Sequence, residues 1–184
     1  MSSRLRLFAA LELPGEAVAA LEALRFDEDV WRRVASSSLH VTLAFLGATE
    51  REVLPAVRGA IDSVAPRAVR LKLAAALLLP PRRPHVLTVA LEDPDAALAA
   101  LQGEVASALA ATGAFSPESR PFRPHVTVGR VRPRVRSPRA VELPVPRLEF
   151  HATAVTLFSS VTAPGGARYE PLASVSLPAG RIDD

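Results

Sequence analysis

The tripeptide His-Val-Thr followed by an aliphatic residue occurs twice in this chain, at residues 40–43 and 125–128. The apolar flanks and the period of two predict a β-strand for each copy. Side chains two positions apart in a strand point to the same face, so each copy places an imidazole beside a hydroxyl and turns its aliphatic residues the other way. The fold must therefore bury one face of each strand. Two such strands lining one cleft would place two acid/base groups and two hydroxyl donors around a shared point.

Hydrophobic periodicity along the rest of the chain predicts strands and helices in mixed order. Strands are expected over residues 4–13, 39–46, 69–79, 86–91, 125–131, 147–161 and 169–177, and helices from Pro14 to about residue 24, from a capping box at Thr49 and Glu52 to about Val64, and over residues 94–111. Gly47 is expected to end the second strand, and a Pro-Gly-Gly turn at 164–166 separates the last two. The proline- and arginine-rich residues 132–146 are expected to form an exposed connection.

This order lacks regular β-α-β alternation, which favours an α+β fold with antiparallel sheets. The two histidine motifs lie 85 residues apart, each on a strand of its own half. We therefore expect a bilobal molecule in which two pseudo-symmetric lobes, each an antiparallel sheet flanked by helices, face one another across an active-site cleft. Residues 1–184 are expected to form a single domain, because linker-like sequence is too scarce for independently folded parts.

Composition excludes several classes of site. The chain has no cysteine, so disulfides, cysteine–zinc sites and cysteine nucleophiles are absent. No carboxylate cluster or histidine spacing indicates a metal, and we expect no metal and no cofactor. The N-terminal residues lack the apolar core of a signal peptide, and the apolar run near residues 73–81 is too short to span a bilayer. We expect a cytoplasmic monomer without a membrane segment.

The basic residues are almost all arginine, with Lys72 the lone lysine, and the net charge is +3. The planar guanidinium group suits phosphate, although the bias also agrees with a genomic preference in base composition.

The repeated motif exceeds chance. Shuffling four histidines and eight threonines would give about 0.2 His-x-Thr matches, whereas the chain has three. The third match, at His151, is followed by small residues that favour strands less, and we expect it to be a surface or sheet-edge histidine. His85 is followed by Thr88 three positions later, which puts imidazole and hydroxyl on opposite faces of a strand, so we expect a structural or loop-exposed role.

Five stretches carry a family resemblance: LHVTLAFLG at 39–47, RPFRPHVTVGR at 120–130, RLFAA at 6–10, Trp31, and a closing pair made of Ser159-Ser160 and RYEPL at 168–172. In this order they resemble the 2H phosphoesterase superfamily, most closely its LigT-like branch of RNA 2',3'-cyclic phosphodiesterases. Two departures are mild, because Gly129 replaces a more usual alanine and the stretch after Arg130 is richer in proline. Neither touches the expected chemistry.

The resemblance implies an enzyme that opens RNA ends bearing a 2',3'-cyclic phosphate to 2'-phosphomonoesters, and possible reversal to 2'-5' RNA ligation. It also implies a metal-independent reaction in which His40 is the proton donor and His125 the proton acceptor. An imidazole suits both roles near neutral pH, and the residues alone do not decide which histidine takes which role. Thr42 and Thr127 are placed to donate hydrogen bonds to phosphoryl oxygens.

Strand alternation gives expectations for two further side chains, and two aromatic side chains are further candidates for contact with substrate. Arg130, five residues after His125, would face away from it on a regular strand, so it reaches phosphate only past the strand's edge or on a bend. Phe45, five residues after His40, is expected in the core by the same alternation, with base stacking as its alternative. Phe122 is a second candidate for stacking a base, and Tyr169 is a candidate contact at the cleft's rim.

Two other functions remain open. One is a noncatalytic module that binds RNA ends, which the retained pairs of histidine and threonine argue against. The other is a cyclic phosphodiesterase acting on small nucleotides. The arginine-rich residues 132–139 favour RNA over a small nucleotide.

Overall fold

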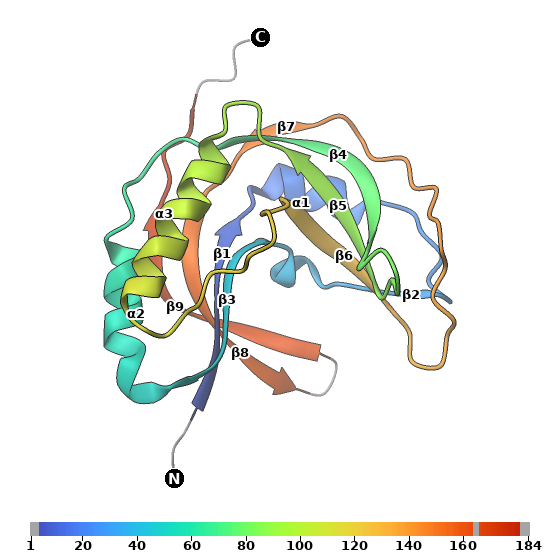
Figure 1. Ribbon diagram of the computed structural model, residues 1–184. Coiled ribbons are helices and arrows are strands. Elements are labelled where there is room, and N and C mark those ends of the chain that lie inside the picture. Colours follow the sequence, from blue (N-terminus) through green and yellow to red (C-terminus); the bar gives the residue numbers. More distant parts are fainter. Residues whose placement is uncertain (1–3, 164–165, 181–184) are drawn as a thin grey trace.

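Nine antiparallel strands form one strongly curled sheet in the computed structural model, which describes residues 4–163 and 166–180 (Figure 1). The strands are β1 (Arg4–Glu12), β2 (Trp31–Arg33), β3 (Val41–Glu50), β4 (Arg70–Leu79), β5 (Val86–Glu92), β6 (His125–Val131), β7 (Glu149–His151), β8 (Ala154–Ala163) and β9 (Gly166–Ser176). The helices are α1 (Gly15–Glu22), α2 (Leu54–Asp62) and α3 (Ala97–Ala111), with single 3-10 turns at Ser36–Ser38 and Arg51–Val53. The α+β prediction is confirmed.

The sheet has two halves that meet at a narrow joint. Its order is β7-β4-β5-β6-β3-β1-β8-β9, with β2 pairing the free part of β6, so both histidine motifs lie on central strands. β3 and β6 are joined only by the pair Val41–Val126, whereas every other pair of neighbours shares three or more residue pairs. The two expected sheets are therefore one hydrogen-bonded path, and two pseudo-symmetric lobes stay a prediction.

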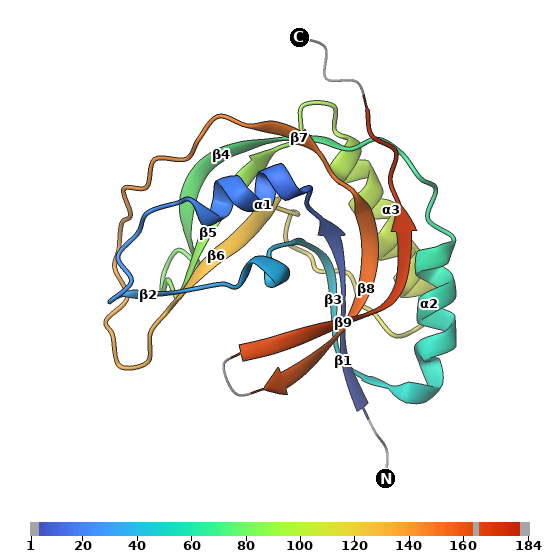
Figure 2. The same cartoon turned by 180° about the vertical axis from the view of Figure 1, so that it is seen from behind.

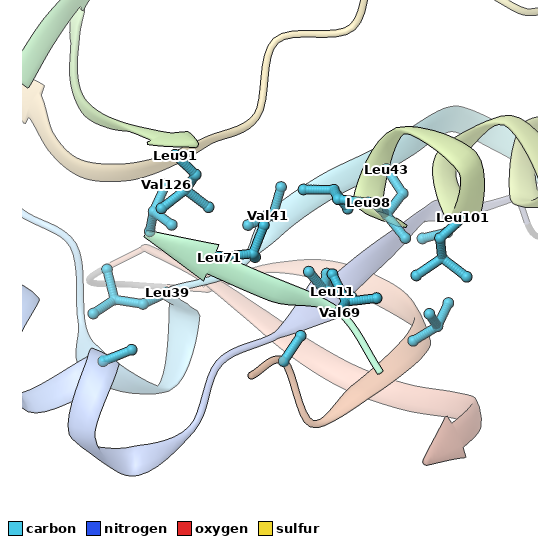
Figure 3. Packing of buried hydrophobic residues seen from close by; sticks show 14 of the residues in the cluster. Leu11, Leu39, Val41, Leu43, Val69, Leu71, Leu91, Leu98, Leu101 and Val126 are labelled. Atoms are coloured by element: carbon cyan, nitrogen blue, oxygen red, sulfur yellow. The ribbon is translucent and has the colours of Figure 1, made fainter. Parts of the chain in front are cut away.

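Helices α2 and α3 pack against each other and against β3, β8 and β9, while α1 lies apart from them, on the side that faces the viewer in Figure 2. Between these layers lies one continuous core, which contains Leu11, Val41, Leu71, Leu98 and Leu101, all fully or almost fully buried (Figure 3). Each such leucine contributes roughly 1.5–3 kcal/mol through its burial. Val41 and Val126 belong to this core, so their buried side chains stabilise the joint between the two halves.

The prediction that Gly47 ends its strand is wrong. β3 runs on to Glu50, and Gly47 adopts a φ of +71°, a left-handed conformation that glycine allows inside an irregular strand. The capping box is also wrong, because Thr49 lies within β3 and its hydroxyl donates to the Gly47 carbonyl. Helix α2 begins at Leu54, which puts Pro55 in the first turn, where its missing N–H removes no helical hydrogen bond.

The strand predicted over residues 147–161 is two strands. β7 pairs with β4 at one edge of the sheet, and β8 pairs with β1 toward the other, so the chain leaves one half and enters the other at Ala152 and Thr153. Residues 132–148 contain no helix or strand, as expected for the connection before β7. Of the turn predicted at 164–166, residues 164 and 165 lie outside the described residues. In the described ranges, no helix has the length and hydrophobicity to cross a membrane.

Candidate active site

Both histidine motifs line one cleft of about 510 Å³. Its walls come from β1, β2, β3, β6, β8 and β9 together with the residues just before β3. All five residues expected to act on substrate line it, namely His40, Thr42, His125, Thr127 and Arg130. Tyr169, expected at the rim, also lines the cleft, whereas Phe122 lines a separate pocket beside Leu91 and Pro124.

The antiparallel pair Val41–Val126 explains how residues so distant in sequence meet. Because the strands run in opposite directions from this pair, position 40 lies beside position 127 and position 42 beside position 125. Each imidazole is thus brought toward the hydroxyl of the other motif, with an approximate local two-fold axis through the valines. The two valine side chains point to the core, and the histidines and threonines point to the cleft.

In each strand, a β-bulge directly after the motif reverses the alternation of the side chains that follow. Thr88 pairs with Thr127 and Leu87 with Gly129, so Val128 is an extra residue in β6. Ala10 pairs with Thr42 and Ala9 with Ala44, so the residue between them is likewise extra in β3. An extra residue reverses which face the following side chains occupy.

The bulges bring the fifth residue after each histidine to the cleft. Arg130 therefore lies on the same face of β6 as His125, because the bulge supplies the bend that Arg130 was expected to need. Phe45 likewise shares the face of His40 and is 49% exposed, so the prediction that it belongs to the core is wrong. The guanidinium of Arg6 lies over the Phe45 ring, 5.0 Å from its centroid.

Backbone carbonyls orient both imidazoles in the same way. His40 Nδ1 donates to the carbonyl of Ser38 at 2.8 Å, and His125 Nδ1 donates to the carbonyl of Arg123 at 2.7 Å. A carbonyl oxygen only accepts, so each Nδ1 carries a proton. This fixes the tautomer in the neutral ring and leaves Nε2 of each histidine as the atom that gains or loses a proton.

The surroundings of the two histidines differ. His40 Nε2 lies 3.1 Å from Thr42 Oγ1, and its ring packs against Phe8 and Tyr169, with centroids 5.0 and 5.4 Å away. Burial lowers the pKa of His40, and the nearby charges of Arg130 and His125 lower it further, against the Ser38 hydrogen bond that raises it. His40 is therefore neutral at pH 7 in the free protein, and its Nε2 accepts a hydrogen bond from the Thr42 hydroxyl.

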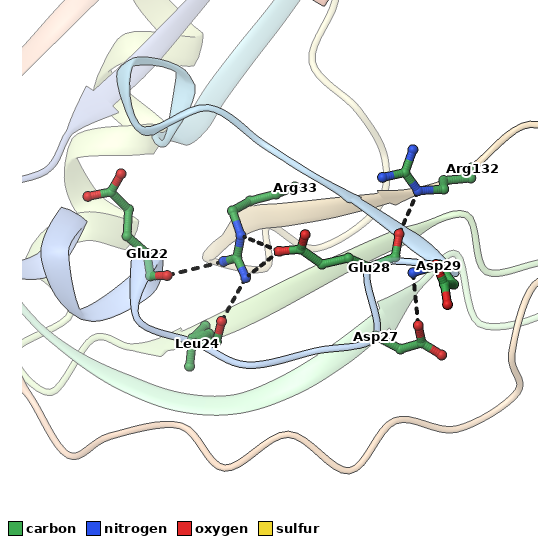
Figure 4. Close-up of polar contacts among 7 residues, drawn as sticks. All are labelled: Glu22, Leu24, Asp27, Glu28, Asp29, Arg33 and Arg132. Atoms are coloured by element: carbon green, nitrogen blue, oxygen red, sulfur yellow. Dashed lines mark hydrogen bonds and ion pairs between the residues drawn. The ribbon is translucent and has the colours of Figure 1, made fainter.

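Arginine gives the cleft a positive wall. Arg6, Arg32 and Arg130 line it without an ion pair to any carboxylate in the described residues, and Arg32 sits opposite Arg130 in the β2–β6 pair. Arg33 is held instead by the carbonyls of Glu22 and Leu24 and by the Glu28 carboxylate (Figure 4). Sequence reasoning missed Arg6 and Arg32, although alternation along residues 4–13 puts Arg6 on the face away from the core leucines.

The remaining histidines lie outside the cleft, as expected. His85 is exposed and donates from Nδ1 to the Arg83 carbonyl, while Thr88 is buried and donates to the carbonyl of Leu77. His151 is on β7, where its ring is in contact with the backbone of Gly180. Within the residues described, no three histidine, cysteine or acidic side chains gather closely enough to hold a metal ion.

The chain has known relatives that match most of its length. A family model described as the 2'-5' RNA ligase superfamily matches residues 13–163. An RNA 2',3'-cyclic phosphodiesterase of Escherichia coli (strain K12) is 32% identical over 179 residues, which cover 94% of this chain and 96% of the relative. A protein of the same description from Aeropyrum pernix is 30% identical over 113 residues, covering 61% and 64%. The crystal structure of E. coli LigT complexed with 3'-AMP superposes with a TM-score of 0.78 at 28% identity, covering 95% of this chain and 99% of that one.

Proposed function

The chain belongs to the 2'-5' RNA ligase superfamily, and from this premise we propose that it hydrolyses 2',3'-cyclic phosphate ends of RNA to 2'-phosphomonoesters with His40 and His125 as its acid and base. The observation that carries the proposal is the pairing of the two motifs across Val41–Val126, which turns both imidazoles into one cleft with Nε2 available. The E. coli relative carries the description of the same activity and matches nearly the whole chain.

The reaction needs a base, an acid and stabilisation of the phosphoryl charge. Nε2 of His125 takes a proton from water, whose oxygen attacks phosphorus and forms a new P–O bond. Nε2 of His40 gives its proton to O3' as the P–O3' bond breaks, which leaves the phosphate on O2'. The proton taken up by His125 and the proton lost by His40 balance, and exchange with solvent restores both histidines.

Charge on the nonbridging oxygens is stabilised by Thr42, Thr127 and Arg130. The Thr127 hydroxyl has no hydrogen-bond partner within the described part of the chain, so it is free to donate to a phosphoryl oxygen. Arg130 adds a charge-assisted hydrogen bond. The bound phosphate also raises the pKa of His40, because a nearby negative charge favours the imidazolium form that donates the proton.

The same groups also join RNA ends when a 5'-hydroxyl takes the place of water. His125 then takes the proton of the 5'-hydroxyl, whose oxygen attacks phosphorus, and His40 gives its proton to O3' as the P–O3' bond breaks, which leaves a 2'-5' bond. Cleavage of that bond is the microscopic reverse, with His125 as acid and His40 as base. Water at ordinary concentration favours hydrolysis, so ligation requires high concentrations of both ends.

The test is to incubate the protein, with EDTA present, with a short RNA that ends in a 2',3'-cyclic phosphate, and to identify the product isomer. A 2'-phosphate is the expected product and identifies O3' as the leaving group. A 3'-phosphate would reverse the orientation of substrate between the histidines. Absence of turnover on RNA ends, with turnover on a small cyclic nucleotide, would support the second candidate; absence of both would support a binding module.

A further inference from the structure

Five arginines outside the cleft have no acidic partner among the residues that the structure describes. We define the arginine arm as Arg134, Arg136 and Arg139 in the connection after β6, together with Arg82 and Arg83 in the β4–β5 turn. All five are exposed, and none forms an ion pair with a carboxylate in the described residues. The two segments are held together, because the Ser137 hydroxyl donates to the Pro84 carbonyl.

Basic residues at the opposite end of the same half behave differently. Arg70 is bound by both Asp95 and Glu149, Lys72 by Glu149, and Arg67 by Glu104. These three basic residues thus have acidic partners, in contrast to the arginines of the arm. The unpaired arginines of the arm are concentrated around the second motif.

The sequence shows the same segregation of charge. Residues 119–141 contain seven arginines and no acidic residue, and residues 73–91 contain Arg82 and Arg83 and no acidic residue. Because the whole chain carries +3, everything outside residues 119–141 carries a net charge of −4. A general arginine bias would spread positive charge over the chain, whereas this positive charge is local.

The arm begins at the edge of the cleft. Arg130 lines the cleft, and Arg132, two residues on, donates to the Glu28 carbonyl, which fastens the start of the connection beside β2 (Figure 4). From there the connection runs around the outer edge of the sheet to β7 in both overall views (Figures 1 and 2). The Val131 amide donates to the His85 carbonyl, which keeps the β4–β5 turn beside the same strand end.

From this placement we propose that the arginine arm binds the phosphodiester backbone of the RNA chain that leads into the cleft. The inference rests on the proposed function, because an RNA whose 3' end occupies the cleft has all of its remaining nucleotides on the 5' side and must leave past one edge. Exposed guanidinium groups on segments that adjoin the end of β6, the strand that carries Arg130, suit a flexible single strand, whose phosphates they contact without reading sequence. The arm therefore selects RNA ends over small cyclic nucleotides.

The test compares binding and turnover for two substrate lengths. The variants are Arg136→Gln/Arg139→Gln and Arg82→Gln/Arg83→Gln, and the charge-matched control is Arg51→Gln/Arg58→Gln, whose residues lie in the 3-10 turn before α2 and within α2. One ligand is a dinucleotide ending in a 2'-phosphate, and the other is a single strand of about ten nucleotides with the same end, within the usual footprint of such sites. Affinity is measured by fluorescence anisotropy at several salt concentrations, and kcat/KM with the matching cyclic phosphates.

We expect the wild type to bind the longer strand more tightly. Each arm variant should lose roughly tenfold in affinity and kcat/KM for that strand, and its salt slope should fall by about 0.7 for each phosphate contact removed. The dinucleotide values and the control variant should stay unchanged. Equal losses for both lengths, equal losses in the control, or wild-type affinity that is independent of length would overturn the proposal. Failure of turnover with a preserved length effect in binding would instead count against the proposed reaction and leave the arm supported.

Discussion

The half-site on β3 and the half-site on β6 share a backbone design and differ in what surrounds their histidines. In each, the imidazole Nδ1 donates to the carbonyl two residues earlier, the next residue but one is threonine, and a bulge brings the fifth residue to the cleft. His40, however, lies against Phe8 and Tyr169 and has a lowered pKa, and the two half-sites end in Phe45 and Arg130. Strand geometry therefore supplies two equivalent positions, and the surroundings make them unequal in chemistry.

The largest expected effect comes from removing either imidazole. His40→Ala and His125→Ala should each lower kcat on a 2',3'-cyclic phosphate by roughly 10²–10⁴, the usual contribution of one general acid or base. EDTA should leave the wild-type rate unchanged, because no step uses a metal. The matched control is His85→Ala, whose imidazole donates to the carbonyl two residues earlier in the same way but lies outside the cleft. A similar loss in this control, or restoration of EDTA-treated enzyme by added metal, would contradict the two-histidine site.

The two histidines are also expected to differ on substrates with a good leaving group. A nitrophenyl phosphodiester releases a phenolate that needs no proton, so loss of the acid matters less than loss of the base. We expect His40→Ala to retain much more of its wild-type rate on this substrate than His125→Ala does, measured by nitrophenolate release. The reverse order would exchange the two roles.

The next largest effect is expected from substituting Phe45 and Arg130, the fifth residues after His40 and His125. The two substitutions should separate binding of phosphate from binding of the base. Arg130→Gln should lower kcat/KM about 10- to 100-fold, because a charge-assisted hydrogen bond worth roughly 1.5–3 kcal/mol is lost. Phe45→Ala should act mainly on KM, since a stacking contact contributes about 1–3 kcal/mol to binding of a base. Two substrates distinguish binding of phosphate from binding of the base in steady-state kinetics. One is a dinucleotide that ends in a 2',3'-cyclic phosphate, and the other is a 2',3'-cyclic phosphate that has no base on its 5' side. Equal effects of Phe45→Ala on both substrates would exclude base stacking.

These fifth positions also show where sequence reasoning ends. Alternation predicted most of the strands and put the histidine and the threonine of each motif on one face, but it missed β2 and joined β7 to β8. It misplaced Phe45 and made Arg130 conditional on a bend, because a period of two fails after one inserted residue. A bulge depends on the register with a neighbouring strand, here Leu87–Thr88 for β6, and local sequence does not contain that register.

The pairing of the motifs lay beyond the sequence for a related reason. Nothing local to residues 40–43 or 125–128 states that Val41 pairs with Val126, since this contact depends on the order of all the strands. Arg6 and Arg32 were missed because they reach the cleft from β1 and β2, which carry no motif. The family resemblance implied the chemistry, and the fold was needed to find the groups that surround the two motifs.

The threonines test the difference in hydrogen bonding between the half-sites. Thr42→Val and Thr127→Val should each lower kcat about tenfold, which corresponds to one hydrogen bond of about 1.4 kcal/mol in the transition state. Thr42 also contacts His40 Nε2, so its loss should additionally change the pH profile, whereas loss of Thr127 should not. Thr88→Val is unsuitable as a control because that hydroxyl is buried and bonded; Thr153→Val, at an exposed position between β7 and β8, is the matched surface control. Identical pH profiles for Thr42→Val and Thr127→Val would show that the contact of Thr42 with His40 does not influence the titration of the site.

The smallest effect is a shift in the pH dependence. Burial, assisted by the charges of Arg130 and His125, lowers the pKa of His40 from 6.5, so the free enzyme loses its acid as the pH rises through a value below 6.5. Because kcat/KM reports the free enzyme, the limb that follows His40 should lie below pH 6.5 in kcat/KM and at a higher pH in kcat, since bound phosphate favours the imidazolium. Arg130→Gln removes one of the charges that lower this pKa and should move the same limb of kcat/KM upward. A limb that stays in place in this variant would show that the charge of Arg130 does not influence His40.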